Sequence, residues 1–381
     1  MDFELSSEQK ALVENTRKFV KDRIIPVAGQ CDEEERFPME VAQEAFELGL
    51  MTPLIPEEYG GSGLSELDHA LLVEELGYGC TGIQTSITAN VLCTTPILVA
   101  GNEEQKKKYL GSVTKELTFG AYAITEPAAG SDAAGIQTTC KKVGDDWVLN
   151  GQKCYITNAS FARWFIVFAT TDPSQRHKSI MCFVVDADTP GVSIGKKEKK
   201  LGQRASDTAT VILEDVKVSK DQVLAGEGDG FKLAMHTFDR TRPDIAASAC
   251  GLMRRALDES IAFATERETF GTAISNHQMV QKMLAEMAMR YEATRMLTHK
   301  AAWMVEKGSR NSLIASYSKA FGADSAMAVA TDAVQVFGGA GYMRDYPVEK
   351  LMRDAKILQI YEGTSQIQRM VIARNLIAGK R

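Results

Sequence analysis

The sequence predicts a mostly helical α+β protein with an N-terminal helical domain, a middle β-barrel-like domain and a C-terminal four-helix bundle. Two observations lead to this prediction. Helical periodicity dominates both ends of the 381-residue chain, whereas the middle carries short runs rich in β-branched and aromatic residues. Long helical patterns separated by short breaks near the C-terminus are typical of a bundle. We expect the three domains to span residues 1–117, 118–230 and 231–381.

The first domain is expected to be built from helices. Ser6 and Gln9 form a capping-box pattern ahead of an amphipathic stretch. Further helical patterns cover 40–49, 66–78 and 82–100, and the glycines of "PEEYGGSGLS" indicate a loop before the second of them.

Strand-like runs distinguish the middle domain. Asn150-Gly151 inside "WVLNGQKCYIT" predicts a β-hairpin turn between two strands. The runs at 164–171, 179–186 and 208–219 predict further strands.

The third domain is expected to return to helices. Met279, Met283, Met287 and Met289 recur near helical spacing, and we interpret them as core packing. Breaks such as "ETFGTAISN" and "EKGSRN" separate the long helices.

Composition excludes several classes of protein. A net charge of −6 gives no basic surface for nucleic acid. Seven cysteines without a CxxC pair predict free thiols in a reducing compartment, and five scattered histidines predict no metal site. The N-terminus has neither signal- nor transit-peptide features, and no run approaches the ~20 apolar residues of a membrane span. We expect a soluble protein, cytoplasmic in a bacterium or in the mitochondrial matrix as a processed chain.

The segment "YAITEPAAGSD" lies where the helical pattern gives way to strands. Thr125, Ser131 and several backbone N–H groups could face a ligand there, and Gly130 permits close backbone approach. Such a loop suits a planar polar heterocycle or a phosphate, although a plain turn around Pro127 is the alternative.

Two further segments offer groups for a ligand. In "QKCYITNAS", Tyr155 could stack on an aromatic ring and Thr157 could donate to a ring nitrogen, although an ordinary strand explains both. In "TERETFGTAISNHQ", Arg267 could hold a pyrophosphate beside Phe270 and Gln278, although a solvated helix end is the alternative. The glycines of "QVFGGAGY" follow no strand and form no GxGxxG, so they do not predict a Rossmann site.

Seven segments in one order together resemble the acyl-CoA dehydrogenase family over almost the whole chain, and its medium-chain and short-chain branches most. They are "YAITEPAAGSD", "GQKCYITN", "LGQRASDTATVILEDVKV", "FDRTRP", "ERETFG", "QVFGGAGY" and "LMRDAKILQIYEGTSQIQR". The resemblance implies FAD held between the middle domain and the bundle and partly covered by a neighbouring subunit. It also implies a homotetramer arranged as a dimer of dimers.

The resemblance further implies which residues contact ligands. The implied FAD contacts are Tyr122, Ile124, Thr125, Gly130, Ser131, Tyr155, Ile156, Thr157, Thr364 and Gln366, with Arg267, Phe270, Gln278, Gln335, Val336, Gly338 and Gly339 reaching FAD from the adjacent subunit. The implied acyl-CoA contacts are Ser131, Asp239, Arg242, Arg310 and Gly363.

Glu362 in "IYEGTSQIQR" would, taken alone, be read as a solvated surface carboxylate. The resemblance implies instead that Glu362 is the catalytic base, taking the α-proton of a thioester while the β-hydrogen leaves as hydride to flavin N5. Its backbone N–H and an FAD ribityl hydroxyl are implied to polarise the thioester carbonyl. Burial raises a carboxyl pKa and a following helix N-terminus lowers it; we expect burial to prevail once substrate is bound.

Single positions discriminate between branches of the family. Thr241 occupies the site where the isovaleryl and long-chain branches are expected to carry the base, and no Lys or Arg occurs between 70 and 100 to bind a dicarboxylic substrate. Tyr155 replaces the more usual tryptophan beside the flavin, and Thr88 lies where medium-chain relatives can carry an acid. Leu64 retains part of the surface expected to dock electron-transfer flavoprotein.

The implied function is FAD-dependent α,β-desaturation of a short- to medium-chain acyl-CoA to the trans-2-enoyl-CoA in fatty acid β-oxidation, with electrons passed to electron-transfer flavoprotein. Two alternatives remain open: an oxidase or a dehydrogenase specialised for branched or cyclic acyl groups, and a non-catalytic relative that binds FAD or CoA.

Overall fold

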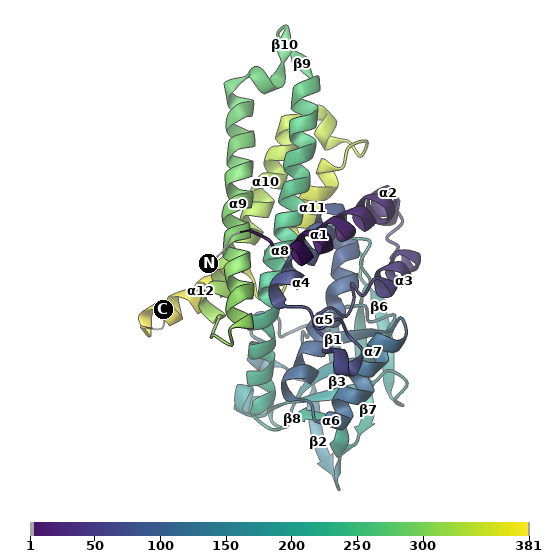
Figure 1. Ribbon diagram of the computed structural model, residues 1–381. Helices are drawn as coiled ribbons and strands as arrows, with labels where there is room; N and C mark the ends of the chain where they lie inside the picture. The colour runs from purple at the N-terminus through teal and green to yellow at the C-terminus, as the bar shows by residue number, and fades with distance from the viewer. Residues whose placement is uncertain (1–3, 380–381) are drawn as a thin grey trace.

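The computed structural model describes residues 4–379 and places three parts along one long central helix, α8 (Figure 1). Helices form the first and third parts and strands the second, so the predicted fold class is confirmed. The outermost residues of the first and third predicted domains, 1–3 and 380–381, lie outside the described chain.

The N-terminal part consists of helices, and its predicted capping box is confirmed. Gln9 N–H donates to Ser6 Oγ at 3.2 Å, and Ser6 N–H donates to Gln9 Oε1 at 3.1 Å. The α-helices are α1 (Ser7–Phe19), α2 (Ile25–Glu33), α3 (Met39–Glu47), α4 (Glu66–Gly79), α5 (Thr81–Ala100), α6 (Glu103–Gln105) and α7 (Gly111–Lys115). Among residues 4–379, α5 alone is long and apolar enough for a membrane span, and most of its apolar window is buried in the fold.

An eight-stranded sheet forms the middle part, in the order β6-β7-β3-β2-β4-β5-β8, with β1 paired in parallel to β4. The strands are β1 (Phe119–Ala123), β2 (Thr139–Val143), β3 (Asp146–Thr157), β4 (Ala162–Thr170), β5 (Ile180–Asp186), β6 (Val192–Lys197), β7 (Thr208–Val218) and β8 (Val223–Ala225). The predicted strands at 164–171, 179–186 and 208–219 are therefore confirmed within one or two residues.

The predicted hairpin turn at Asn150-Gly151 is wrong. β3 continues through this dipeptide without reversing. The chain turns earlier, where Val143 pairs with Asp146 across Gly144. Gly151 (φ +156°) lies at a register shift between β3 and β7, which marks a bulge. The Asn150 amide is held by two hydrogen bonds to Asp215 on β7, so this Asn-Gly pair bends a strand instead of reversing it.

The C-terminal part is a helical bundle joined to the sheet by α8, which runs from one part into the other (Figure 1). Its elements are α8 (Asp229–Glu266), β9 (Glu268–Thr269), β10 (Thr272–Ala273), α9 (Gln278–Glu306), α10 (Ser312–Phe337), α11 (Val348–Leu358) and α12 (Ser365–Ile377). Met287 is buried and Met283 packs in a small cluster, but Met279 and Met289 are exposed. The core interpretation is thus wrong for those two methionines.

Two buried carboxylates, paired with arginines, join the first part to the bundle. Glu75 on α4 accepts from Arg17 at 2.9 Å and from Arg254 on α8 at 2.6 Å. Its neighbour Glu74 accepts from Arg295 on α9 at 3.1 Å. Because buried charges are tolerated only when they are paired, these contacts fix α1, α4, α8 and α9 relative to one another.

We predict that Gly251→Ala destabilises the protein. A Cβ at Gly251 on α8 would lie 2.1 Å from the Glu74 carbonyl oxygen and 2.5 Å from the Tyr78 nitrogen, which are backbone atoms that cannot turn aside. Overpacking of this kind costs about 1–3 kcal/mol or more and should lower the thermal midpoint.

The matched control is Gly111→Ala in α7, where the nearest atom to an added Cβ is the Lys115 Cε at 4.0 Å. Equal thermal midpoints for the two variants, measured by calorimetry, would contradict the close α4–α8 crossing.

Candidate functional site

Glu362 lies in the short segment between α11 and α12, with its backbone in the left-handed region (φ +51°). A non-glycine residue in this region costs of order 1–3 kcal/mol and persists only where surrounding contacts fix it. Gly363 follows at φ +89°, and Thr364 then caps α12 by accepting from Ile367 N–H at 3.1 Å.

Three side chains hold this strained backbone. Arg242 on α8 donates through Nε to the Glu362 carbonyl oxygen at 3.3 Å. Gln368 donates to the carbonyl oxygens of Glu362 and Gly363 at 3.1 and 3.0 Å, and Lys319 on α10 donates to that of Gly363 at 2.7 Å. Since all three donors are buried, the direction of the Glu362 side chain is fixed by elements far apart in the sequence.

The Glu362 carboxyl group points towards α8. Thr241 Oγ1 donates to Glu362 Oε2 at 2.9 Å. Burial raises the pKa of Glu362 to about 7; the Thr241 hydrogen bond opposes the rise, the nearby charge of Asp244 adds to it, and Arg242 and Lys319 lower it. A carboxyl group with this pKa exchanges protons near neutral pH, which general acid–base catalysis requires.

Two polar groups beside this carboxyl have no partner. Among the residues from 4 to 379, nothing accepts from the backbone N–H of Glu362. The Tyr122 hydroxyl is buried and likewise lacks a partner within the described chain. Because a buried hydroxyl is nearly always hydrogen-bonded, the Tyr122 hydroxyl suggests that a polar ligand belongs between β1 and Glu362, within reach of a backbone N–H that has no acceptor.

The loop at 122–131 is fixed from beneath by Glu126. Its carboxylate accepts from Lys153 Nζ at 2.7 Å and from the backbone N–H groups of Gln137 and Thr138 at 2.5 and 3.0 Å. Burial alone would raise the pKa of Glu126, but Lys153 and these donors outweigh burial and hold that pKa below its usual value. The predicted ligand loop is thus anchored by a buried ion pair that the sequence analysis did not find.

A second bulge in β3 directs Tyr155 outward. The β3–β7 register shifts between Lys153 and Ile156, and Tyr155 has φ +60° with 65% of its surface exposed. Thr157 lies at the end of the same strand, and Cys154 N–H donates to the Thr125 carbonyl oxygen at 2.9 Å. That bond joins the two segments that are predicted to hold the flavin ring, at Thr125 and Cys154.

Another predicted group gathers at the far tip of the bundle. Phe270 (φ +52°) and Gly271 (φ +78°) form the two-residue turn between β9 and β10, which leaves Phe270 98% exposed. Val336 packs with Ile274 in the same small cluster, so 335–339 lies close to this turn. The side chains of Arg267, Gln278 and Gln335 are exposed, as are Gly338 and Gly339.

The structure does not bring these two groups together within one chain. The β9–β10 turn lies at one end of the molecule and the sheet at the other, with the length of the bundle between them (Figure 1). A planar ligand that contacts both groups therefore needs a second copy of the chain. Open space beside the backbone fits this arrangement, because a Cβ added at Gly130, Gly338 or Gly339 would meet no atom within 4 Å.

The predicted acyl-CoA contacts are mostly close to Glu362. Arg242 donates to Asp239 Oδ1 at 2.8 Å, and Asn311 donates to the Asp239 carbonyl oxygen at 2.6 Å. Arg310 precedes Asn311 and is exposed beside this group, whereas Ser131 lies exposed on its loop next to the sheet. Four of the predicted FAD contacts lie at strand ends and at the start of α12. They are Ile124 directly after β1, Ile156 near the end of β3, and Thr364 and Gln366 at the start of α12.

Neither Lys319 nor Gln368 was predicted from the sequence, nor was the contact between Thr241 and Glu362. Lys319 is fully buried in α10, an otherwise small and apolar helix, and its pKa is lowered to about 8 by burial. A single lysine within such a run is the sequence signal that could have revealed it.

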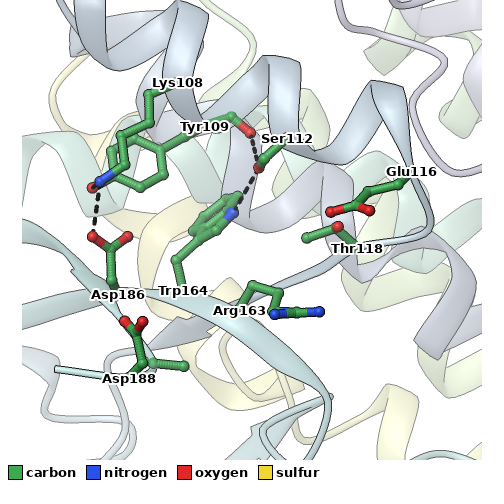
Figure 2. A pocket seen from close by; sticks show the side chains of 10 residues that line it. Lys108, Tyr109, Ser112, Glu116, Thr118, Arg163, Trp164, Asp186 and Asp188 are labelled. Carbon is green, nitrogen blue, oxygen red and sulfur yellow. Dashed lines mark hydrogen bonds and ion pairs between the residues drawn. The ribbon is translucent and has the colours of Figure 1, made fainter.

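A surface cavity of about 550 Å³ lies elsewhere, between α7 and the β4–β5 edge (Figure 2). Lys108 pairs with Asp186 at 2.8 Å across it, and Trp164 Nε1 donates to Ser112 Oγ at 3.2 Å. None of the predicted site residues lines this cavity.

Comparison with known proteins follows the three parts of the fold. Models of the acyl-CoA dehydrogenase N-terminal, middle and C-terminal domains match residues 6–116, 121–216 and 228–377. The "probable medium-chain specific acyl-CoA dehydrogenase 2, mitochondrial" of Caenorhabditis briggsae is 48% identical over 380 residues, which cover 99% of this chain and 92% of that protein.

Solved structures agree with these matches. Butyryl-CoA dehydrogenase from Megasphaera elsdenii is 39% identical, with a TM-score of 0.96 over 99% of this chain and 100% of that one. PigA, solved with FAD and proline, is 29% identical, with a TM-score of 0.95 over the full length of both chains.

We predict that the free energy of unfolding of Glu362→Gln rises relative to that of wild type as the pH increases from 5 to 8. The wild-type carboxyl keeps its proton up to about pH 7 when folded but loses it near 4.5 when unfolded, so the free energy of unfolding falls as pH rises between these values. Glutamine escapes this loss, which amounts to at most about 3 kcal/mol. Thermal midpoints across this pH range measure the effect, and a difference independent of pH would contradict the raised pKa.

Proposed function

The chain belongs to the acyl-CoA dehydrogenase family, and from that premise we propose that it desaturates a short- to medium-chain acyl-CoA to the trans-2-enoyl-CoA, with Glu362 as catalytic base. As a member of this family it is an FAD-dependent oxidoreductase. Its proposed place is fatty acid β-oxidation, in the bacterial cytoplasm or the mitochondrial matrix.

One observation carries the proposal: Glu362 offers a titrating carboxyl group and a free backbone N–H side by side. A thioester whose carbonyl oxygen accepts from that N–H would present its α-carbon close to the carboxyl. The same residue would then polarise the carbonyl and remove the proton that polarisation acidifies.

Each side chain around Glu362 has a defined part in this chemistry. Arg242, Gln368 and Lys319 keep the N–H and the carboxylate in one orientation, so little reorganisation is needed during reaction. Thr241 holds the carboxyl oxygen that does not face the substrate. A positioned base of this kind contributes ~10²- to 10⁴-fold to the rate.

Bound FAD would supply the acceptor for the β-hydride. The loop at 122–131 and Tyr155 to Thr157 would hold its ring. The unpartnered Tyr122 hydroxyl and the open space beside Gly130 are consistent with a flat polar ring at this place. Arg267, with a guanidinium that pairs with no carboxylate in the described chain, would bind the pyrophosphate from the adjacent subunit.

We assign the exposed apolar tip of the bundle to contacts between subunits of a homotetramer, a dimer of dimers. Phe270, Met279 and Tyr342 are 98%, 69% and 79% exposed there, which is unusual for large apolar side chains on a monomer. A tetramer also gives each cofactor the tip residues that its own chain cannot supply.

The end of the acyl pocket is proposed to lie between α5 and α8. Ser248 on α8 donates to Gln84 Oε1 at 2.7 Å, and Gln84 Nε2 donates to Thr88 Oγ1 at 2.8 Å. Gln84 and Ser248 are both buried, and Ser248 lies two turns after Thr241 along α8. This polar clasp would close the space into which a long acyl chain would otherwise extend, and it supports the short- to medium-chain assignment.

Electron-transfer flavoprotein is the proposed acceptor of the electrons. A surface groove of about 570 Å³ lies on the N-terminal part, lined by the apolar side chains of Leu12, Phe19, Leu48 and Leu50 and rimmed by Lys18 and Arg23. Such a groove has an apolar centre and a charged rim, which are features of transient protein interfaces.

We predict that Glu362→Gln lowers the rate of flavin reduction by acyl-CoA by about 10²-fold or more. FAD content and acyl-CoA affinity should stay near wild type. The measurement is anaerobic bleaching of the flavin by a panel of straight, branched and cyclic acyl-CoAs. Glu104→Gln, at an exposed glutamate of α6, is the matched control and should react like wild type. Turnover by Glu362→Gln at the wild-type rate would overturn the assignment.

We predict that Gln84→Ala shifts the preferred acyl chain to greater length, because it opens the clasp between α5 and α8. The readout is kcat/KM across straight-chain acyl-CoAs of increasing length. An unchanged optimum, with the enzyme still folded and flavin-loaded, would show that the pocket ends elsewhere.

A further inference from the structure

A cluster of four ionisable side chains lies beside the base, on the α4 side of α8. Glu66 on α4 accepts from Arg240 on α8 at 2.6 Å. His69, one turn further along α4, has its Nε2 at 3.3 Å from Asp244 Oδ2 on α8. The desaturation chemistry described above uses none of these four groups.

His69 is completely buried, and Asp244 provides its only polar contact among residues 4–379. Small apolar side chains such as Ala70, Val73 and Ala247 surround the pair. An imidazolium buried next to a carboxylate in apolar surroundings is stabilised by the charge of that carboxylate. Burial lowers the pKa of His69, but the contact with Asp244 and, less strongly, the charge of Glu66 outweigh burial and raise that pKa above its usual value.

Asp244 connects this pair to the base. It lies three residues, or nearly one helical turn, after Thr241, whose hydroxyl donates to the Glu362 carboxyl. The Asp244 charge acts directly on Glu362 and favours its protonated form. The charge state of the His69–Asp244 pair therefore affects the ionisation of Glu362, although His69 does not itself contact Glu362.

The other groups that face Glu362 come from every surrounding element. Arg242 on α8 and Lys319 on α10 carry positive charge, whereas Tyr122 on β1 and Tyr361 next to the base are neutral phenols whose pKa values are raised by burial. Arg242 is already paired with Asp239, and Lys319 donates to a carbonyl oxygen. Asp244 thus acts on Glu362 as a negative charge, and its ion-pair partner within the described chain is the titrating side chain of His69.

We propose that His69 and Asp244 are positioning residues that act as a buried electrostatic pair and set the pH at which Glu362 becomes an active base. With His69 protonated, the pair is neutral and Glu362 ionises readily. With His69 uncharged, the unpaired Asp244 opposes a second negative charge at Glu362, so ionisation moves to higher pH. The inference rests on the proposed role of Glu362.

Two substitutions of similar size give different expectations. His69→Gln keeps a hydrogen-bond donor to Asp244 but removes the compensating charge, so the Glu362 ionisation midpoint should rise by about one pH unit. Asp244→Asn removes the opposing charge and, with it, the main reason for buried His69 to keep its proton, so the net charge beside Glu362 stays near zero and the midpoint should stay near the wild-type value. In the double variant, the effect of His69→Gln should disappear, because it acts only through Asp244.

The experiment titrates Glu362 directly. Infrared difference spectra of the FAD-loaded enzyme without substrate would follow the protonated carboxyl band that is lost in Glu362→Gln. The pH dependence of flavin reduction by acyl-CoA, recorded by stopped flow for the same variants, provides the second readout. Glu259→Gln, which breaks the ion pair with Arg255 further along α8, is the control and should leave both midpoints unchanged.

A raised midpoint in His69→Gln that returns to the wild-type value in the double variant would establish the pair. An unchanged or lowered midpoint in His69→Gln, or a raised midpoint that persists in the double variant, would overturn the proposal. If His69→Gln does not fold, His69→Asn takes its place with the same expected shift and the same double variant. The proposed function fails separately, only if wild-type flavin is not reduced by any acyl-CoA or if Glu362→Gln reduces it normally.

Discussion

The left-handed backbone at Glu362 is the constraint on which the site depends. At this position one residue carries a carboxyl group that titrates near pH 7 and a backbone N–H with no acceptor in residues 4–379. The strained backbone persists because Arg242, Gln368 and Lys319 hold the carbonyl oxygens of Glu362 and Gly363. Helices α8, α10 and α12 must therefore be packed correctly before Glu362 is correctly placed.

Several ion pairs with a buried member join separate elements of the fold. Glu126 with Lys153 anchors the ligand loop, Glu75 with Arg254 joins the N-terminal part to the bundle, and His69 with Asp244 joins α4 to α8. Breaking a buried pair is costly because one charge is left unpaired. This cost makes the relative positions of the elements specific, and near Glu362 it also gives the fold a means of adjusting a pKa.

The sequence predicted the order of the three parts and most strands because periodicity is a local property. It failed at Asn150-Gly151, where a strong turn signal forms a bulge instead, since Asp215 on a distant strand holds Asn150. It also assigned Met279 and Met289 to the core, although both are exposed. Periodicity shows that side chains share a face, but not whether that face meets the same chain or another copy.

Within the proposed site, Glu362 and the two middle-domain loops could be proposed from the sequence only because their motifs resemble a known family. The groups around Glu362 were not predictable, since Lys319, Gln368 and Asp244 approach it from segments distant in the sequence or in another element. The central claim is that the Glu362 carboxylate removes the α-proton of a bound thioester. Hydrogen–deuterium exchange at the α-carbon of acyl-CoA recovered from D₂O, measured by mass spectrometry, tests it most directly. The account predicts exchange with the wild-type enzyme and none with Glu362→Gln; equal exchange with both would contradict it.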